Sequence, residues 1–156
     1  MIRKLINDDR ALLKQVLIDT QHFNAEEIQV ALELIDTYLK DEQSDYIIYV
    51  HTNDITDKVE GYICYGKRPL TESTYDLYWI AVDPNTHGKG IGSRLIAFME
   101  EDLKERGAKL VLIETSGKAA YENERKFYEK NRYKLQTVIR DFYRPGDHLV
   151  LYHKYL

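Results

Sequence analysis

The spacing of apolar residues along this chain predicts helices, because apolar positions that repeat every three to four residues fall on one face of a helix. Three such stripes are Leu12–Leu13–Val16–Leu17, Ile28–Leu32–Ile35–Leu39 and Ile91–Leu95–Met99–Leu103, and a fourth helix is expected over Ala119–Asn131. Asn7 and Asp8 are candidate caps for the first helix. Asn24 and Glu27 have the form of a capping box for the second, and Gly107 is a suitable stop for the third.

Shorter runs rich in β-branched and aromatic residues predict strands between these helices. The runs are Ile2–Ile6, Tyr46–Val50, Val59–Tyr65, Tyr75–Val82, Lys109–Ile113, Tyr133–Asp141 and Leu149–Leu156. Tyr75–Val82 is almost wholly apolar or aromatic, which is typical of a central strand buried on both faces. The resulting order is β-α-α-β-β-β-α-β-α-β-β, a mixed α/β (α+β) fold with a central twisted mixed sheet. We find no repeat, linker or low-complexity segment, and we therefore expect residues 1–156 to form a single domain.

Composition narrows the class of protein. Of the 156 residues, 44% are hydrophobic and 31% are charged, which is typical of a soluble globular chain. The net charge of −4 gives no sign of the basic face of a nucleic-acid binder. Without a leader-like or membrane-length apolar stretch, we expect a cytoplasmic protein that does not bind membranes. The lone Cys64 is expected to be a buried thiol, and the scattered histidines lack metal-ligand spacing.

The most informative stretch is I-A-V-D-P-N-T-H-G-K-G-I-G-S-R-L, residues 80–95. A buried strand is followed there by a turn, by three glycines at alternate positions, and by an amphipathic helix. Glycine allows the backbone to approach a ligand closely, and the first amides of a helix attract anions. The pattern therefore predicts an anion-binding loop, with an ordinary glycine-rich turn as the alternative. A Walker loop would need Gly-Lys-Ser or Gly-Lys-Thr, and a dinucleotide fold would need G-x-G-x-x-G in an opening β-α-β unit; neither is present.

This loop resembles the acetyl-CoA signature of the GNAT superfamily of N-acetyltransferases, written Q/R-x-x-G-x-G/A. His87 takes the Gln/Arg position, which is a departure from the family, and Gly90 and Gly92 take the two glycine positions. The run K-F-Y-E-K-N-R-Y, Lys126–Tyr133, resembles the family's F-Y-E-K-x-G-F run, with Asn131-Arg132 in place of the usual glycine, so we expect the turn there to differ. The resemblance is good from about Tyr75 to Tyr133, and before that it rests on the order of elements.

The resemblance implies that acetyl-CoA is the cosubstrate, and the scattered histidines predict that no metal is bound. The main chain of Ile80, Ala81 and Val82 would then border pantetheine, and the Val82 amide would face the developing oxyanion. The pyrophosphate would lie on the loop; the residues implied are His87, Gly88, Lys89, Gly90, Ile91, Gly92 and Ser93. Lys89 and Arg94 could add positive charge, although each is as readily a solvated cation at a helix end.

The resemblance also implies residues for the two proton transfers. Tyr128 holds the position of the family's usual general acid, with a half-buried core tyrosine as the alternative. Glu114 lies where a buried strand ends, at a position that often carries the base in related N-terminal acetyltransferases. Asp76 is the second candidate base. Either carboxylate could instead accept only local hydrogen bonds.

These residues do not identify the amine that accepts the acetyl group. A small-molecule amine or an amino acid is the first hypothesis, and an N-terminal peptide amine is the alternative. A third hypothesis, from a different functional class, is that the protein is a non-catalytic acyl-CoA-binding module with the same fold. Because related proteins are often dimers, the resemblance also allows a homodimer.

Overall fold

A computed structural model of the chain describes residues 1–41, 43–86 and 88–156. Its elements are β1 (Ile2–Lys4), α1 (Asp9–Asp19), α2 (Ala25–Lys40), β2 (Tyr46–Thr52), β3 (Val59–Lys67), β4 (Thr74–Val82), the 3₁₀ turn η1 (Pro84–Thr86), α3 (Ile91–Glu105), β5 (Leu110–Ser116), η2 (Ala119–Tyr121), α4 (Glu122–Lys130), β6 (Lys134–Arg144) and β7 (Asp147–Tyr155). The order of strands and α-helices in these residues is the predicted one, so the mixed α+β fold is confirmed. None of the described helices is long and apolar enough to cross a membrane.

Packing divides the chain into two compact units. Unit 1 comprises Met1–Gly66 and Trp79–Glu101, and unit 2 comprises Lys67–Tyr78 and Asp102–Leu156. β4 contributes its last residues to unit 1 and its first residues to unit 2. The strand order along the mixed sheet is β1-β2-β3-β4-β5-β7-β6.

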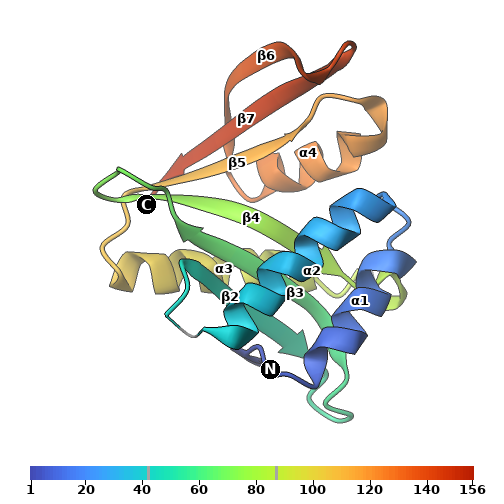
Figure 1. The fold of residues 1–156 in the computed structure, drawn as a ribbon. Helices are drawn as coiled ribbons and strands as arrows, with labels where there is room; N and C mark the ends of the chain where they lie inside the picture. Colours follow the sequence, from blue (N-terminus) through green and yellow to red (C-terminus); the bar gives the residue numbers. More distant parts are fainter. Residues whose placement is uncertain (42, 87) are drawn as a thin grey trace. The chain divides into compact units, whose positions relative to one another are not determined.

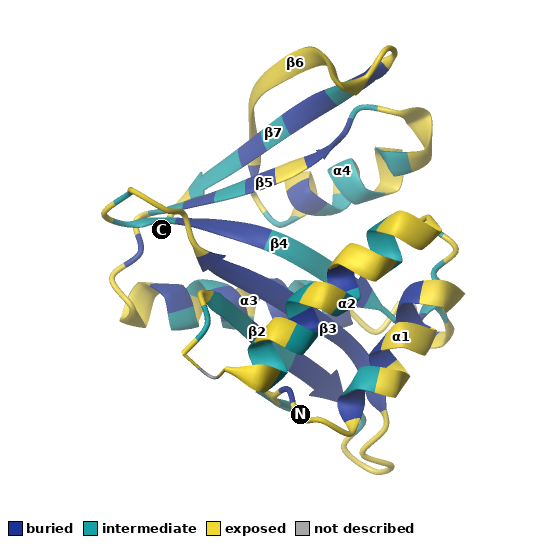
Figure 2. Ribbon diagram, viewed as in Figure 1, coloured by how far each residue is buried: buried dark blue, intermediate teal, exposed yellow. Residues whose placement is uncertain are grey.

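In unit 1, antiparallel strands β1, β2 and β3 are covered by helices on both faces. α1 and α2 lie in front of these strands and α3 lies behind them (Figure 1). Every residue of β3 except Lys67 is buried, as the dark ribbon in Figure 2 shows. Cys64 is one of these residues, and burial raises the pKa of its thiol, so the predicted buried thiol is confirmed. The apolar side chains predicted for α3, Ile91, Leu95, Met99 and Leu103, are all buried.

The start of α1 differs from the prediction. Asp8 has helical backbone angles and its side chain caps nothing. Asp9 is the buried carboxylate instead: it accepts a hydrogen bond from the Ile6 amide at 2.9 Å and is held by both terminal nitrogens of Arg3, at 2.7 and 2.9 Å. On α1, Leu12 is exposed, while the other three residues of the predicted stripe are buried.

Two other predicted helix ends are confirmed. The Asn24 side chain accepts the Glu27 amide at 2.8 Å and the Glu27 carboxylate accepts the Asn24 amide at 3.2 Å, which is a complete capping box. At the end of α3, Gly107 has a φ of +80°, and the amide of Ala108 reaches back to the Leu103 carbonyl. These bonds satisfy carbonyls that the last helical turn leaves open.

In unit 2, β5 pairs in parallel with the first half of β4 and antiparallel with β7, which in turn pairs with β6. α4 packs on these strands: the rings of Tyr128 and Tyr152 are 6.1 Å apart, and Arg125 donates to the Ser116 carbonyl at 2.8 Å. The predicted helix over Ala119–Asn131 begins with a 3₁₀ turn, so its α-helical part starts only at Glu122. Every residue of the edge strand β6 is exposed (Figure 2).

The turn after α4 keeps a conformation that normally needs glycine. Arg132 has a φ of +68°, its amide bonds the Glu129 carbonyl at 2.9 Å, and the Tyr133 amide bonds the Tyr128 carbonyl at 3.0 Å. This is the pattern that a left-handed glycine makes at a helix end. Arg132, which stands where the family run has glycine, therefore adopts a left-handed conformation, at a cost of about 1–2 kcal/mol for a residue with a Cβ.

Gly61 in β3 is fixed by the close approach of β4. A Cβ placed on Gly61 would lie 2.8 Å from the Ala81 carbonyl oxygen and 3.3 Å from the Val82 Cα. Because these are backbone atoms, the last residues of β4 would have to move away from β3. The absence of a side chain at Gly61 thus sets the position of Ala81 and Val82.

We expect Gly61→Ala to destabilise the protein by about 1–3 kcal/mol, the usual cost of overpacking a core. Chemical denaturation would measure this loss. Gly117→Ala is the matched control, because its Cβ would meet nothing nearer than 3.4 Å. Equal stability of the two variants would show that β4 moves without cost.

Candidate functional site

The glycine-rich loop links β4 to α3 within unit 1. Gly88 has a φ of +83° and Gly90 a φ of +70°, so both occupy the left-handed region that favours glycine. An added Cβ would meet nothing within 4 Å at either residue. The loop therefore exposes backbone on an open side, as a ligand cradle requires. His87, which was predicted to belong to this site, lies outside the described residues.

The amides at the start of α3 are available to an anion. Arg94 donates the first bond of the helix to the Gly90 carbonyl, at 3.0 Å. The amides of the three preceding residues, Ile91, Gly92 and Ser93, consequently have no partner within the helix. Together with the positive end of the helix dipole they suit a phosphate group, so the residues present fit the pyrophosphate of acetyl-CoA.

Asp83 fixes the entry to this loop. Its amide bonds the Glu60 carbonyl at 2.8 Å, and its carbonyl accepts both the amide and the hydroxyl of Thr86, at 2.9 and 2.8 Å. Its buried carboxylate accepts two bonds from Asn85 at 2.9 Å and lies 3.2 Å from the Lys58 ammonium. Burial opposes ionisation here, but the bonds from Asn85 and Lys58 prevail and lower the pKa of Asp83. The loop thus begins from a rigid turn.

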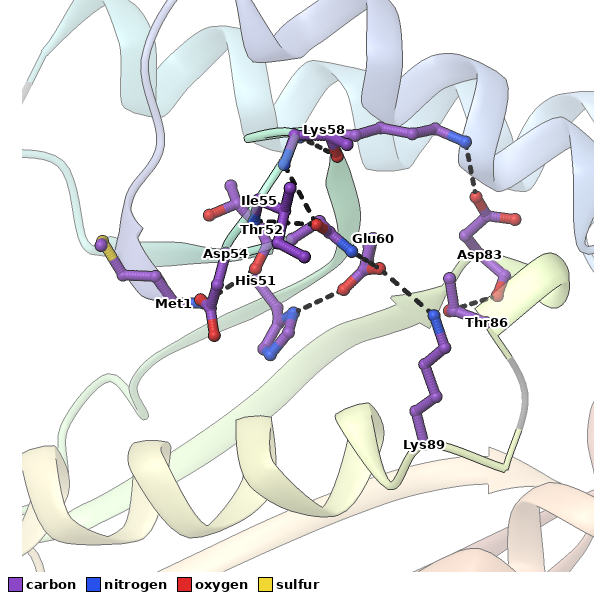
Figure 3. A network of polar contacts seen from close by, with 12 residues as sticks. Met1, His51, Thr52, Asp54, Ile55, Lys58, Glu60, Asp83, Thr86 and Lys89 are labelled. Atoms are coloured by element: carbon purple, nitrogen blue, oxygen red, sulfur yellow. Dashed lines mark hydrogen bonds and ion pairs between the residues drawn. The ribbon is translucent and has the colours of Figure 1, made fainter.

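The strand residues that were predicted to border pantetheine differ in exposure. Ala81 is buried against Gly61, whereas Ile80 and Val82 are half-buried. Lys89 is exposed, and its ammonium lies 3.8 Å from the Glu60 carboxylate rather than free in solvent (Figure 3).

Glu60 was not predicted as a site residue. It is buried in β3, and Figure 3 shows it between His51 of β2 and Lys89 of the loop. The signal that could have found it is a charged residue inside the apolar run Val59–Tyr65. A buried carboxylate needs partners, and here they include a residue of the cradle itself.

In unit 2, both predicted base candidates contact a single arginine. The Arg68 guanidinium lies 2.9 Å from the Asp76 carboxylate and 3.6 Å from that of Glu114. Asp76 is buried, while 42% of the Glu114 side chain is exposed. Burial raises the pKa of Asp76 above its ordinary value, and Arg68 partly offsets that rise. Arg68 was missed from the sequence because only the pairing of β4 with β5 brings these carboxylates together.

Tyr128 is buried in an aromatic cluster of unit 2. Its ring centroid lies 5.6 Å from that of Phe127, 6.5 Å from Tyr133 and 6.1 Å from Tyr152. Burial, and after it the Glu124 carboxylate, raises the pKa of Tyr128 above its ordinary value. The phenol is therefore protonated at neutral pH, and the same rise makes it a weaker acid than a solvated tyrosine.

No group of three or more His, Cys, Asp or Glu side chains in residues 1–41, 43–86 and 88–156 is arranged to hold a metal ion.

The sequence profile of the acetyltransferase (GNAT) family matches residues 12–132, which is most of the chain. The chain belongs to this family. A GNAT-family protein from Desulfovibrio desulfuricans is 38% identical to this acetyltransferase, with a TM-score of 0.93 over 99% of this chain and 98% of that one. The predicted family and enzyme class are thereby confirmed, and with them the use of acetyl-CoA that the resemblance implied.

More distant structures share the fold of this acetyltransferase. An aminoglycoside 6'-N-acetyltransferase complexed with coenzyme A is 15% identical, with a TM-score of 0.75 over 99% of this chain and 96% of that one. The ribosomal-protein-S18-alanine N-acetyltransferase of Escherichia coli is 16% identical, with a TM-score of 0.74 over 99% and 92%. No curated protein matches the sequence significantly. The two structures are equally similar, so neither distinguishes a small-molecule acceptor from a protein.

Proposed function

We propose that this acetyltransferase transfers the acetyl group of acetyl-CoA directly to a primary amine of a small molecule or an amino acid. The observation that carries the proposal is the open cradle of Gly88 and Gly90 at the start of α3. An exposed carboxylate, Glu114, supports an acceptor that arrives as a cationic amine. Acetyl-CoA would supply the activated acetyl group, and the protein would bind, orient and move protons.

The cradle would hold the pyrophosphate through the amides of residues 88–93. The main chain of Ile80 and Val82 would pair with pantetheine, and the Val82 amide would stabilise the negative charge that develops on the acetyl oxygen. Support comes from Gly61, which sets the position of this part of β4. A preset amide lowers the barrier because it needs no reorientation during the reaction.

Glu114 is the proposed base for the amine proton. It is solvent-exposed, so it can act through a water molecule and release the proton again. Asp76 is less suited, because its carboxylate is buried and held by Arg68. Tyr128 is the proposed donor to the departing thiolate.

The acceptor class can be tested with purified protein, acetyl-CoA and a panel of small amines, amino acids and peptides. Mass spectrometry of the products and release of free CoA are the readouts. Turnover with small amines or amino acids is the expected result. Turnover with peptides alone would replace the proposal by N-terminal acetylation, and tight CoA binding without any turnover would indicate a non-catalytic acyl-CoA-binding module.

We expect Glu114→Gln to slow the reaction most at pH values below the pKa of the acceptor amine. The amine is protonated there, so a base is needed before attack. A pH–rate profile would show the loss as a steeper fall on the acidic side. Asp76→Asn is the matched variant, since it also neutralises a carboxylate beside Arg68. An unchanged profile for Glu114→Gln and a steeper one for Asp76→Asn would transfer the role to Asp76.

We further propose that residues 1–156 act as one N-acetyltransferase domain in the cytoplasm, without nucleic acid or membrane as partners. A homodimer is part of this proposal, and sedimentation of the purified protein would test it.

A further inference from the structure

A buried carboxylate lies directly behind the phosphate cradle. In Glu60, Oε1 accepts the Asn53 side-chain amide at 3.0 Å, and Oε2 lies 3.2 Å from His51 Nδ1. His51 Nδ1 is itself buried, and it faces the Glu60 carboxylate. The third neighbour is the Lys89 ammonium, 3.8 Å from Oε1 (Figure 3).

These partners differ in their freedom to move. The side chains of Glu60 and His51 are only 7% and 8% exposed, whereas that of Lys89 is 57% exposed. Lys89 is also the only one of the three that belongs to the glycine loop. A phosphate on the loop amides would therefore present a second, stronger anion to a mobile ammonium that now faces a buried carboxylate.

We propose that Glu60 and the pyrophosphate on the cradle compete for the Lys89 ammonium, and that His51 takes up a proton when Lys89 leaves Glu60. This inference rests on the proposed function, because it takes the cradle to be the CoA site. Glu60 is then a positioning residue: it touches no ligand and acts on binding through Lys89. The competition would weaken the binding of CoA and so favour its release after transfer.

The proton uptake follows from the charges around His51. Burial first, and then the N-terminal ammonium and Arg94 of α3, hold the pKa of His51 below its ordinary value, while Glu60 of β3 opposes them. Asp54 also lies near the N-terminal ammonium. When Lys89 leaves, Glu60 loses its mobile counter-charge, and an anion at the start of α3 offsets part of the field of Arg94. Both changes raise the pKa of His51.

The rise in the pKa of His51 on binding determines how the affinity for CoA changes with pH. A pKa that is higher in the complex than in the free protein makes binding tightest at pH values below both pKa values. Affinity is then lost as pH rises from the free pKa to the bound one, by up to about tenfold per pH unit for one proton. We therefore expect CoA to bind more weakly as pH rises through this window.

Calorimetry of CoA binding in two buffers with different heats of ionisation would count the protons taken up. A substantial fraction of one proton near neutral pH is expected for the wild-type protein. Glu60→Gln keeps a partner for Asn53 but removes the charge, so the uptake should vanish and CoA should bind about two- to fivefold more tightly. Glu72→Gln, which removes an exposed carboxylate in the β3–β4 turn, should leave both quantities unchanged.

Lys89→Met is a second variant on an exposed side chain, and it should fold whatever Glu60→Gln does. Its binding should be about three- to tenfold weaker, again without proton uptake, because His51 would already balance Glu60 in the free protein. CoA binding without proton uptake by the wild type, or equal uptake by Glu60→Gln, would overturn the inference. Failure of the folded wild type to bind CoA would overturn the proposed function instead.

Discussion

Tyr128→Phe is expected to lower kcat by about tenfold or more, since a positioned general acid typically contributes about 10²- to 10⁴-fold. The ring remains, so its contacts with Phe127, Tyr133 and Tyr152 should persist. Only the hydroxyl that would protonate the thiolate is lost. Steady-state kinetics with saturating acetyl-CoA would measure the change, and the affinity for acetyl-CoA should stay near that of the wild type.

Tyr133→Phe and Tyr121→Phe are the controls for this effect. Tyr133 is buried in the same aromatic cluster and Tyr121 precedes the same helix, so each variant removes one phenol with little change of packing. Both should keep most of the activity. Full activity of Tyr128→Phe would mean that water or another residue protonates the thiolate. A joint loss of cofactor binding and melting temperature would mark Tyr128 as a structural core residue.

Gly90→Val is expected to weaken the binding of CoA by about 10- to 100-fold, the loss of one or two hydrogen bonds to a charged group. The residue has a φ of +70°, which a β-branched side chain adopts only with strain, and its Cβ would project into the open side of the loop. Titration calorimetry would measure the affinity, and circular dichroism would confirm that the variant is folded.

Gly107→Val is the control that distinguishes the effect of backbone strain from the effect of a blocked ligand contact. Its φ of +80° imposes the same backbone penalty, and its Cβ also meets nothing within 4 Å, but it lies at the C-terminal end of α3. It should lose stability and keep its affinity for CoA. If Gly90→Val bound CoA as well as Gly107→Val does, the pyrophosphate would have to bind elsewhere.

Apolar spacing was sufficient to predict the order of the elements and the buried face of α3, because burial on a helix follows a simple period. The loop was predictable for a related reason: positive φ at Gly88 and Gly90 depends on residue type, which a sequence displays directly. The exposure of Leu12 was not predictable in this way, because a charged residue, Asp9, is buried with Arg3 at the start of α1 while Leu12 is not.

The charged clusters could not be derived from spacing. Arg68 precedes Glu114 by many positions along the chain, and their contact depends on the register in which Leu77 pairs with Ile113. The same is true of Glu60, whose contact with His51 depends on the pairing of β2 with β3. Register is a property of the folded sheet, and one-residue changes in it reverse the face of every side chain.

Different kinds of selection would retain Gly61 and Gly90 in unit 1. A Cβ added at Gly61 would lie 2.8 Å from the Ala81 carbonyl oxygen, so selection for a folded protein would retain this glycine. A library screened only for cellular abundance should reject every larger residue at Gly61, because any Cβ meets backbone there. The same screen should accept asparagine at Gly90, since asparagine tolerates a left-handed backbone and nothing surrounds its Cβ. A screen for activity should then reject that asparagine. The difference between the two screens would trace the ligand face of the loop residue by residue.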